Sequence, residues 1–223
     1  MSTTDSVFPE AHIERLSLKD QAADLLRDMI VSGKIVSGSK VTERDVAEWL
    51  KISRMPARDA LMELEREGLI VNKPGGRYVI ELGEQDIRQL YQLRTALEKL
   101  AIELAIGNSS LVNQKALEAK LAEMCHAIKV GNTAAYTASD LELHELLWQQ
   151  AGNPYLLDML NSMIGPIFML IASQARMIED WQKSLLLHEQ LLETIRNRDI
   201  KAALDSIEAH LHHSQTLALS AFQ

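Results

Sequence analysis

The sequence has few of the features that mark secreted and membrane proteins. Cys125 is the only cysteine among 223 residues, which excludes an intramolecular disulfide framework and fits a reducing cytoplasm. The most apolar stretch, MLNSMIGPIFMLIAS, is interrupted by Gly165-Pro166 and by polar residues, so it predicts a buried helix rather than a membrane span. The first residues, MSTTDSVFPEAHIER, lack the basic and apolar regions of a signal peptide. We therefore expect a cytoplasmic protein without membrane association.

Aromatic residues are also scarce, at 4%, whereas leucine and alanine are plentiful, and this composition favours helices. The net charge of -8 argues at first against nucleic-acid binding. However, residues 1–80 contain 12 Lys and Arg against 13 Asp and Glu, while residues 81–223 contain 11 against 18. Because nearly all the excess negative charge lies in the second part, the first part can still present a basic face.

Three helices are predicted in the first part of the chain. SLKD, which starts at Ser17, has the form of a capping box, and apolar residues then recur at helical spacing until Gly33. A second helix opens at Thr42, where TERD is another capping box. Ser53 is the expected N-cap of a third helix, RMPARDALMELERE, which ends at Gly68.

A β-hairpin is predicted next, in LIVNKPGGRYVI, where two β-prone runs flank a Lys-Pro-Gly-Gly turn. Three helices followed by a hairpin predict a winged helix-turn-helix DNA-binding domain over residues 16–80. Residues 1–15 are polar and lack periodicity, so we expect them to form a flexible arm.

Residues 84–223 contain only helical patterns, so they are predicted to form an antiparallel helical bundle. Gly165-Pro166 is expected to kink the fourth helix of this bundle. The fold class is therefore mostly α, with an N-terminal winged helix-turn-helix followed by an all-helical bundle. The predicted helices of the bundle span 84–106, 110–130, 133–151, 154–178, 181–197 and 199–221.

The third predicted helix carries candidate DNA contacts. One of its faces is an apolar arc that must pack against the core, and Arg54 and Arg58 lie side by side just outside this arc. Two arginines four residues apart near a helix N-terminus suit base edges and phosphates in the major groove. The alternative from spacing alone is a solvated, charged surface helix. The arc comprises Ala57, Ala60, Leu61 and Leu64.

Further candidate contacts lie on either side of this helix. Arg44 can hold the DNA backbone, and Gly75 and Gly76 would let the hairpin tip approach the minor groove. The segments LKDQAADLLRDMIVSGKI, VTERDVAEWLKISRMPARDALMELEREGLI and GGRYVI closely resemble the DNA-binding domain of GntR-family bacterial transcription regulators over residues 18–80. Val36-Ser37-Gly38 departs from the Pro-Gly turn usual in that family, which affects only a connection. The resemblance implies operator contacts by Arg44, Arg54, Arg58 and a wing-tip glycine.

A second candidate site combines one carboxylate with three histidines. Asp140 and His144 lie four residues apart and would share one helix face, while His188 and His210 lie on later helices. Each histidine alone is better explained as a hydrogen-bonded core or surface residue. Together, the four form a plausible site for a divalent transition ion with positions open for water or ligand. We expect zinc, with nickel or manganese as alternatives.

The spacing of these residues also has a family likeness. D-x3-H, then AGN, then a His beginning H-x2-LL-x2-I-x3-D, then a His twenty-two residues later, resembles the FCD domain. This is the helical effector domain of the FadR subfamily of GntR regulators, and ELGEQDIRQLYQLRTALEKLAIELA resembles its first helix, so the likeness spans roughly 84–215. It argues against an acyl-CoA effector, because fatty-acyl-responsive members lack the four ligands. The resemblance implies that the metal ligands are Asp140, His144, His188 and His210.

Arg94, in YQLRTALE, corresponds to a family position that often faces the effector cavity. The resemblance implies that Arg94 pairs with the oxygens of a small carboxylate effector. The alternative is a surface arginine in a salt bridge with Glu98. We do not count His213 as a ligand, and we expect Trp148 and Trp181 in the core.

These features together predict a dimeric, ligand-responsive transcription regulator, a repressor by expectation. It would bind a short palindromic operator, one half-site per protomer, and the effector would move the bundle and lower operator affinity. Two alternatives stay open. In one, the metal itself is the signal. In the other, the chain is a helical metalloenzyme, since such a centre could activate water, although no clear general base accompanies the four ligands.

Overall fold

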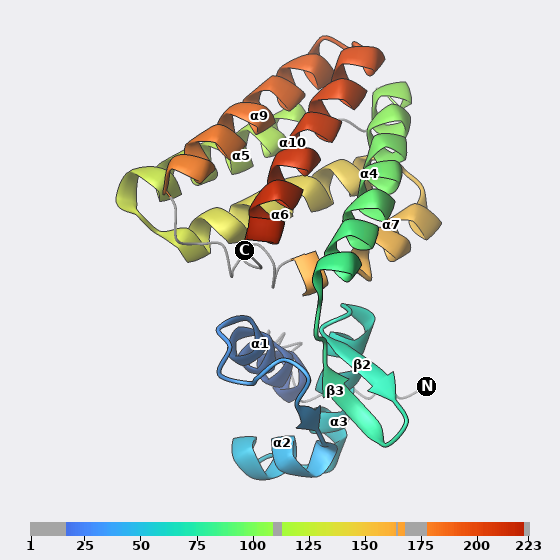
Figure 1. Ribbon diagram of the computed structural model, residues 1–223, viewed down its shortest axis with the longest axis vertical. Coiled ribbons are helices and arrows are strands. Elements are labelled where there is room, and N and C mark those ends of the chain that lie inside the picture. The colour runs from blue at the N-terminus through green and yellow to red at the C-terminus, as the bar shows by residue number, and fades with distance from the viewer. Residues whose placement is uncertain (1–16, 109–112, 164, 168–177, 221–223) are drawn as a thin grey trace, which may run out of the picture.

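The chain folds around two separate hydrophobic cores, one between Ala22 and Val79 and the other between Ile87 and Ala218. The computed structural model describes residues 17–108, 113–163, 165–167 and 178–220. Figure 1 shows the two parts one above the other, with a helical bundle on one side and a winged helix on the other. The mostly α fold class is therefore confirmed. The predicted arm, residues 1–15, lies outside the described residues.

The winged helix contains the three predicted helices. The capping box at the first helix is present, since the Asp20 amide donates to the Ser17 hydroxyl at 3.2 Å and the Ser17 amide donates to the Asp20 carboxylate at 3.2 Å. Ser53 is the N-cap of the third helix, as predicted, although its side chain makes no capping hydrogen bond. The helices are α1 (Leu18–Val31), α2 (Glu43–Leu50) and α3 (Arg54–Arg66).

The predicted apolar arc of α3 is confirmed, because all four of its side chains are fully buried. They pack with residues of α1 and α2 in the smaller core. Arg54 and Arg58 are exposed on the same helix, as expected for residues just outside the arc. Hydrophobic burial therefore fixes the rotation of α3 and decides which side chains face solvent.

The sheet has one strand more than the sequence predicts. The hairpin consists of β2 (Ile70–Lys73) and β3 (Gly76–Val79), and β1 (Lys40–Val41) pairs antiparallel with β3, so the order is β1-β3-β2. Lys73 pairs with Gly76 across a two-residue turn. A two-residue strand has no periodicity to detect, and its pairing partner lies almost forty residues further along the chain.

The bundle contains the expected helices with shifted ends. The predicted helix 154–178 is interrupted, because α7 ends at Asn161 and residues 162–163 form a turn before residues 165–167 return to helix. The rest of that prediction falls largely on residues 164 and 168–177, outside the described part. The helices are α4 (Glu84–Gly107), α5 (Gln114–Val130), α6 (Thr133–Gln150), α7 (Pro154–Asn161), α9 (Ile178–Arg196) and α10 (Ile200–Ser220).

The bundle contacts the winged helix at the end of α3. The Gly165 N–H donates to the carbonyl oxygen of Glu67 at 2.8 Å. A Cβ on Gly68, which has φ +77°, would lie 2.6 Å from the carbonyl oxygen of Ser162. The Glu67 side chain is held from the other side by Arg27, whose guanidinium donates to both carboxylate oxygens at 2.7 and 2.9 Å. Two glycines therefore permit close backbone packing between the two parts.

Within the described residues, the helices are too short or too polar to span a membrane.

Candidate functional site

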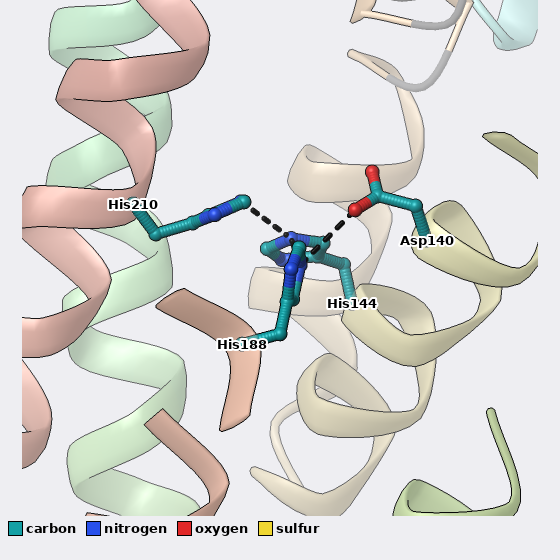
Figure 2. Close-up of side chains that lie close together, drawn as sticks. All are labelled: Asp140, His144, His188 and His210. Carbon is teal, nitrogen blue, oxygen red and sulfur yellow. Dashed lines mark hydrogen bonds and ion pairs between the residues drawn. The ribbon is translucent and has the colours of Figure 1, made fainter. Parts of the chain in front are cut away.

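Four side chains from three helices of the bundle converge on one point. Asp140 and His144 lie on the buried face of α6, and His188 and His210 come from α9 and α10. Figure 2 shows that the carboxylate and the three rings point toward one another. One potential ligand atom of each lies within 4.8 Å of all the others, and the four side chains are 0–4% exposed. The predicted set is therefore brought together in space.

The rings meet through their Nε2 atoms. Nε2 of His144 lies 3.1 Å from Nε2 of His210 and 3.3 Å from Nε2 of His188. Nε2 of His188 also lies 3.0 Å from a carboxylate oxygen of Asp140. These distances suit groups that share one small cation at their centre.

The outer nitrogens of two rings have partners that can only accept. Nδ1 of His144 lies 2.6 Å from a carboxylate oxygen of Glu98, and Nδ1 of His188 lies 2.8 Å from the backbone carbonyl of Ser184. A carboxylate or carbonyl needs a donor, so each Nδ1 carries a hydrogen, and in a neutral ring Nε2 is then a lone pair. Consequently, lone pairs of His144 and His188 and the oxygen of Asp140 face one another with no hydrogen between them.

This arrangement fits a divalent metal ion. Acceptors that face one another in a buried site repel unless a positive charge lies between them, either a shared proton or a metal. Burial opposes ionisation of the Asp140 carboxyl, but its contact with His188 and the neighbouring His144 and Arg94 together lower its pKa below its usual range. Burial and then the neighbouring His188 and His144 lower the pKa of His210 well below its usual range. An ionised Asp and a neutral imidazole are the forms that bind metals.

Arg94 and Glu98 form a buried ion pair beside the four ligands. Nε of Arg94 donates to Glu98 at 2.5 Å, and both side chains are 1% exposed. The alternative that placed this pair on the surface is therefore wrong, although the pair itself exists. Nη1 of Arg94 is buried without a hydrogen-bond partner among the described residues. Burial opposes ionisation of Glu98, but His144 and Arg94 lower its pKa to about 2.

Glu98 is the residue that sequence reasoning missed at this site. Its spacing from Arg94 indicated an ion pair, but its contact with His144 joins residues 46 positions apart, and no local pattern predicts that. Trp148 and Trp181 are buried in the larger core, as expected. His213 lies on α10 and is also largely buried, outside the group of four.

The candidate DNA contacts lie on α2, on α3 and at the tip of the hairpin. In Figure 1, α2 and the hairpin tip lie on the side of the winged helix away from the bundle. A hollow of about 580 Å³ between α2, α3 and the wing is lined by Arg44, Arg54, Gly75 and Gly76. Gly75 and Gly76 have φ of +102° and +133°, which favours glycine at the wing tip. Arg58 is exposed on α3, outside the hollow, with its Nε 3.9 Å from Glu43.

Lys40, Asn72 and Arg77 also line the same hollow and were not predicted as DNA contacts. Lys40 lies on β1 next to the wing, and its Cε would lie 3.1 Å from a Cβ on Gly76. Asn72 lies on β2. Arg77 is tied to Glu43 at 3.0 Å and to Glu65 at 3.2 Å, so its charge is already neutralised. Lys40 was missed because its position depends on the short strand β1.

Comparison with known families agrees with both parts of the molecule. Residues 18–80 match the bacterial regulatory proteins of the gntR family, and residues 89–213 match the FCD domain. The chain belongs to the gntR family of bacterial regulatory proteins, with an FCD domain as its helical half. It is a DNA-binding transcription regulator rather than an enzyme, which decides against the metalloenzyme alternative.

Relatives cover nearly the whole chain. The gluconate operon transcriptional repressor of Bacillus licheniformis is 28% identical over 215 residues, which cover 94% of this chain and 88% of that protein. The protein of the same name from Bacillus subtilis (strain 168) is 27% identical over 221 residues, which cover 96% and 90%. The solved structure of E. coli McbR/YncC is 19% identical with a TM-score of 0.75, covering 94% of this chain and 100% of that chain, which shows a shared fold.

Proposed function

We propose that this chain is a metal-dependent transcriptional repressor of the FadR subfamily. Its winged helix binds a short palindromic operator as a homodimer, in the cytoplasm, where bacterial operators lie. Its bundle binds a divalent transition metal and a small organic acid that alters operator affinity. We place the boundary between the two domains at residues 81–83, between β3 and α4, with residues 16–80 and 84–223 on either side.

The main support for a bound metal is that hydrogen-bond acceptors face one another at the centre of the bundle. Nε2 of His188 lies 3.0 Å from a carboxylate oxygen of Asp140 and 3.3 Å from Nε2 of His144, and a cation between them satisfies all three groups. Zinc suits one carboxylate and three imidazoles, with nickel or manganese as alternatives. When bound, the metal supplies a Lewis-acid position for a ligand oxygen.

The observation that supports an acidic effector is Arg94. Its Nη1 is a buried donor without a partner in the part of the chain that the structure describes, and an arginine can bind a carboxylate with two parallel hydrogen bonds. The relatives named for the gluconate operon support a sugar acid, which carries one carboxylate and several hydroxyls. Arg94 and the metal would then each bind oxygen atoms of the effector's carboxylate.

The DNA-reading surface comprises Arg44, Arg54, Arg58 and the wing-tip glycines. We propose that Arg54 and Arg58 enter the major groove, since they lie in the first half of α3, with Arg44 on the phosphate backbone. Two-fold symmetry of a homodimer requires an operator with two half-sites. The effector can change operator affinity only if it binds one arrangement of the bundle more tightly than the other. The change can be no larger than the ratio of these two effector affinities.

Elemental analysis of untagged protein tests the metal site. Wild type should hold about one zinc, nickel or manganese per protomer, as expected for one complete ligand set. His188→Ala should lose the metal, whereas His126→Ala, at an exposed histidine of α5, should keep it. Wild type without metal after incubation with all three ions would refute the site.

Operator affinity tests the effector. The operator can be selected from a random DNA pool, and its binding measured by fluorescence anisotropy with and without sugar acids, each with metal present. A sugar acid that shifts the affinity of wild type but not of Arg94→Gln supports the proposal. Equal affinity with every acid at saturating metal would refute the acid as effector.

The metal alone is a second candidate signal. All four side chains are 0–4% exposed, so a closed bundle can hold a metal without an added ligand. In that case, operator affinity should follow the free metal concentration with no acid present.

A further inference from the structure

Glu98 is a buried carboxylate that lies outside the group of four ligands but touches one of them. Its two oxygens have different partners. One accepts from Nε of Arg94 at 2.5 Å, and the other lies 2.6 Å from Nδ1 of His144. The three residues come from two helices, α4 and α6, so this carboxylate joins the helices at the depth of the metal site.

We propose that Glu98 is a positioning residue that fixes the tautomer of His144 for metal binding and holds Arg94 in place with the same carboxylate. This inference rests on the proposed function, because it assigns the group that prepares the metal site. It also extends it, because the metal ligand and the acid-binding arginine become parts of one hydrogen-bonded unit.

The tautomer follows from the chemistry of the contact. A carboxylate that is ionised at neutral pH can only accept, so Nδ1 of His144 must carry the hydrogen. Nε2 of His144 is then a lone pair directed toward the other three side chains. Such a carboxylate partner also makes the imidazole more basic, and its loss typically weakens metal binding by about 10–100-fold.

His188 and His144 reach the same tautomer by different means. The backbone carbonyl of Ser184, one turn earlier on α9, lies 2.8 Å from Nδ1 of His188, so no side chain is required. His144 depends on Glu98 from another helix. Substitution of Glu98 can therefore change one ligand while the partner of His188 stays in place.

Glutamine at position 98 separates the two tasks of the carboxylate. A glutamine side chain has nearly the same shape, but it has a single acceptor oxygen. That oxygen can accept from Arg94 or from His144, but its amide nitrogen cannot accept from the other. In Glu98→Gln, the buried guanidinium of Arg94 competes for the one acceptor, so His144 is no longer held in one tautomer.

The double variant Arg94→Met with Glu98→Gln removes this competition. The glutamine oxygen is then free to accept from Nδ1 of His144, and no uncompensated charge is buried. Zinc affinity should therefore fall about 10–100-fold in Glu98→Gln and recover at least in part in the double variant. Recovery after a second substitution is not expected from a merely structural role for Glu98.

The experiment measures zinc affinity by competition with a chelator, and the histidine tautomers of the metal-free protein by nitrogen-15 NMR. The exposed Glu103 on the same helix gives the matched control, Glu103→Gln, which should bind zinc like wild type. Zinc affinity of folded Glu98→Gln within twofold of wild type, with an unchanged His144 tautomer, would overturn the proposal. So would a double variant that binds zinc no better than Glu98→Gln.

Measurements on the wild-type protein cover two further outcomes, a variant that does not fold and a protein that binds no metal. If Glu98→Gln does not fold, NMR of metal-free wild type still reports whether His144 carries its hydrogen on Nδ1 in a hydrogen bond to Glu98. A hydrogen on Nε2 would overturn the proposal. If wild type binds no zinc, nickel or manganese, the proposed metal site fails, whereas the tautomer measurement separately decides the role of Glu98.

Discussion

Replacing Gly165 by alanine tests whether the bundle is attached to α3, the helix that we propose reads DNA. A Cβ at this position would lie 2.6 Å from Cγ of Leu69 and 2.9 Å from the Leu69 amide nitrogen, and closer still to the carbonyl oxygen of Glu67. Two of these three atoms belong to the backbone at the turn between α3 and β2, so they cannot rotate away. The Gly165 N–H to Glu67 hydrogen bond would be lost with the contact.

The expected cost is about 2–4 kcal/mol, since overpacking a close contact costs about 1–3 kcal/mol and a lost hydrogen bond about 0.5–1.5 kcal/mol. The cost cannot exceed the free energy of docking, because the two domains can separate instead of accommodating the clash. For a chain of this size, 1 kcal/mol corresponds to roughly 2–4 °C in the unfolding midpoint. If the unfolding midpoint shifts only slightly while the two domains separate, the shift measures the free energy of docking.

Gly107→Ala is the matched control. A Cβ on Gly107 would meet no atom within 4 Å, and alanine is favoured over glycine in a helix by up to about 1 kcal/mol, so the sign should reverse. Thermal unfolding gives the stability, and amide hydrogen exchange of residues 67–70 and 165–167 reports docking. Gly165→Ala that matches Gly107→Ala in both measurements would refute the attachment of α3 to the bundle.

Three further predictions follow from the two candidate sites and from one partly buried acid, Glu145. Arg54→Ala should weaken operator binding by about 1–3 kcal/mol if the guanidinium reads a base. Arg66→Ala, at the far end of α3, should lose less in the same anisotropy assay, and equal losses would contradict the assignment of Arg54. Saturating zinc should raise the unfolding temperature of wild type but not of His188→Ala, because a ligand stabilises only the state that binds it. Burial and then neighbouring glutamates raise the pKa of Glu145 above its usual value of 4.5, so its ionised form is less favourable in the folded state than in the unfolded state. Glu145→Gln should therefore raise the unfolding temperature at pH 7, and the gain should fade as pH drops through the raised pKa toward 4.5. If the rise in unfolding temperature caused by Glu145→Gln became larger at acidic pH, the pKa of Glu145 could not be raised in the folded state.

Local patterns were sufficient to predict most of the fold. The capping box at Ser17 and the buried arc of α3 follow from residues a few positions apart, and such interactions are encoded in short segments. Strand β1 was missed because its stability comes from pairing with β3, a long-range interaction that two residues cannot signal. Ser53 has the right residue type and position for a cap, yet its side chain makes no capping hydrogen bond, a detail that residue type alone does not decide.

The candidate site was predictable as a set of residue types but not as a network. Asp140 and His144 share a helix face by spacing, whereas their meeting with His188 and His210 rested on the likeness to the FCD domain. The structure brings these four together. The contact of Glu98 with His144 depends on the packing of α4 against α6. The spacing of residues along the sequence does not predict this packing.

The winged helix is attached to the bundle in two ways, through the connection from β3 to α4 and through the Gly165 contact with Glu67. Both attachments lead to helices that contain Glu98 or the candidate metal ligands. The wing strand β3 continues after four residues into α4, which carries Glu98, and Glu98 contacts His144 on α6. From α6 the chain runs through α7 to Gly165, which bonds to Glu67 at the end of α3. A metal bound at Nε2 of His144 would therefore tie together the helices that lead to the wing and to the reading helix. A ligand that changed the angle between α4 and α6 would have to move the winged helix as a whole or break the contact at Gly165. In the proposed homodimer, either result would change the separation of the two α3 helices, which a palindromic operator would detect through the spacing of its half-sites.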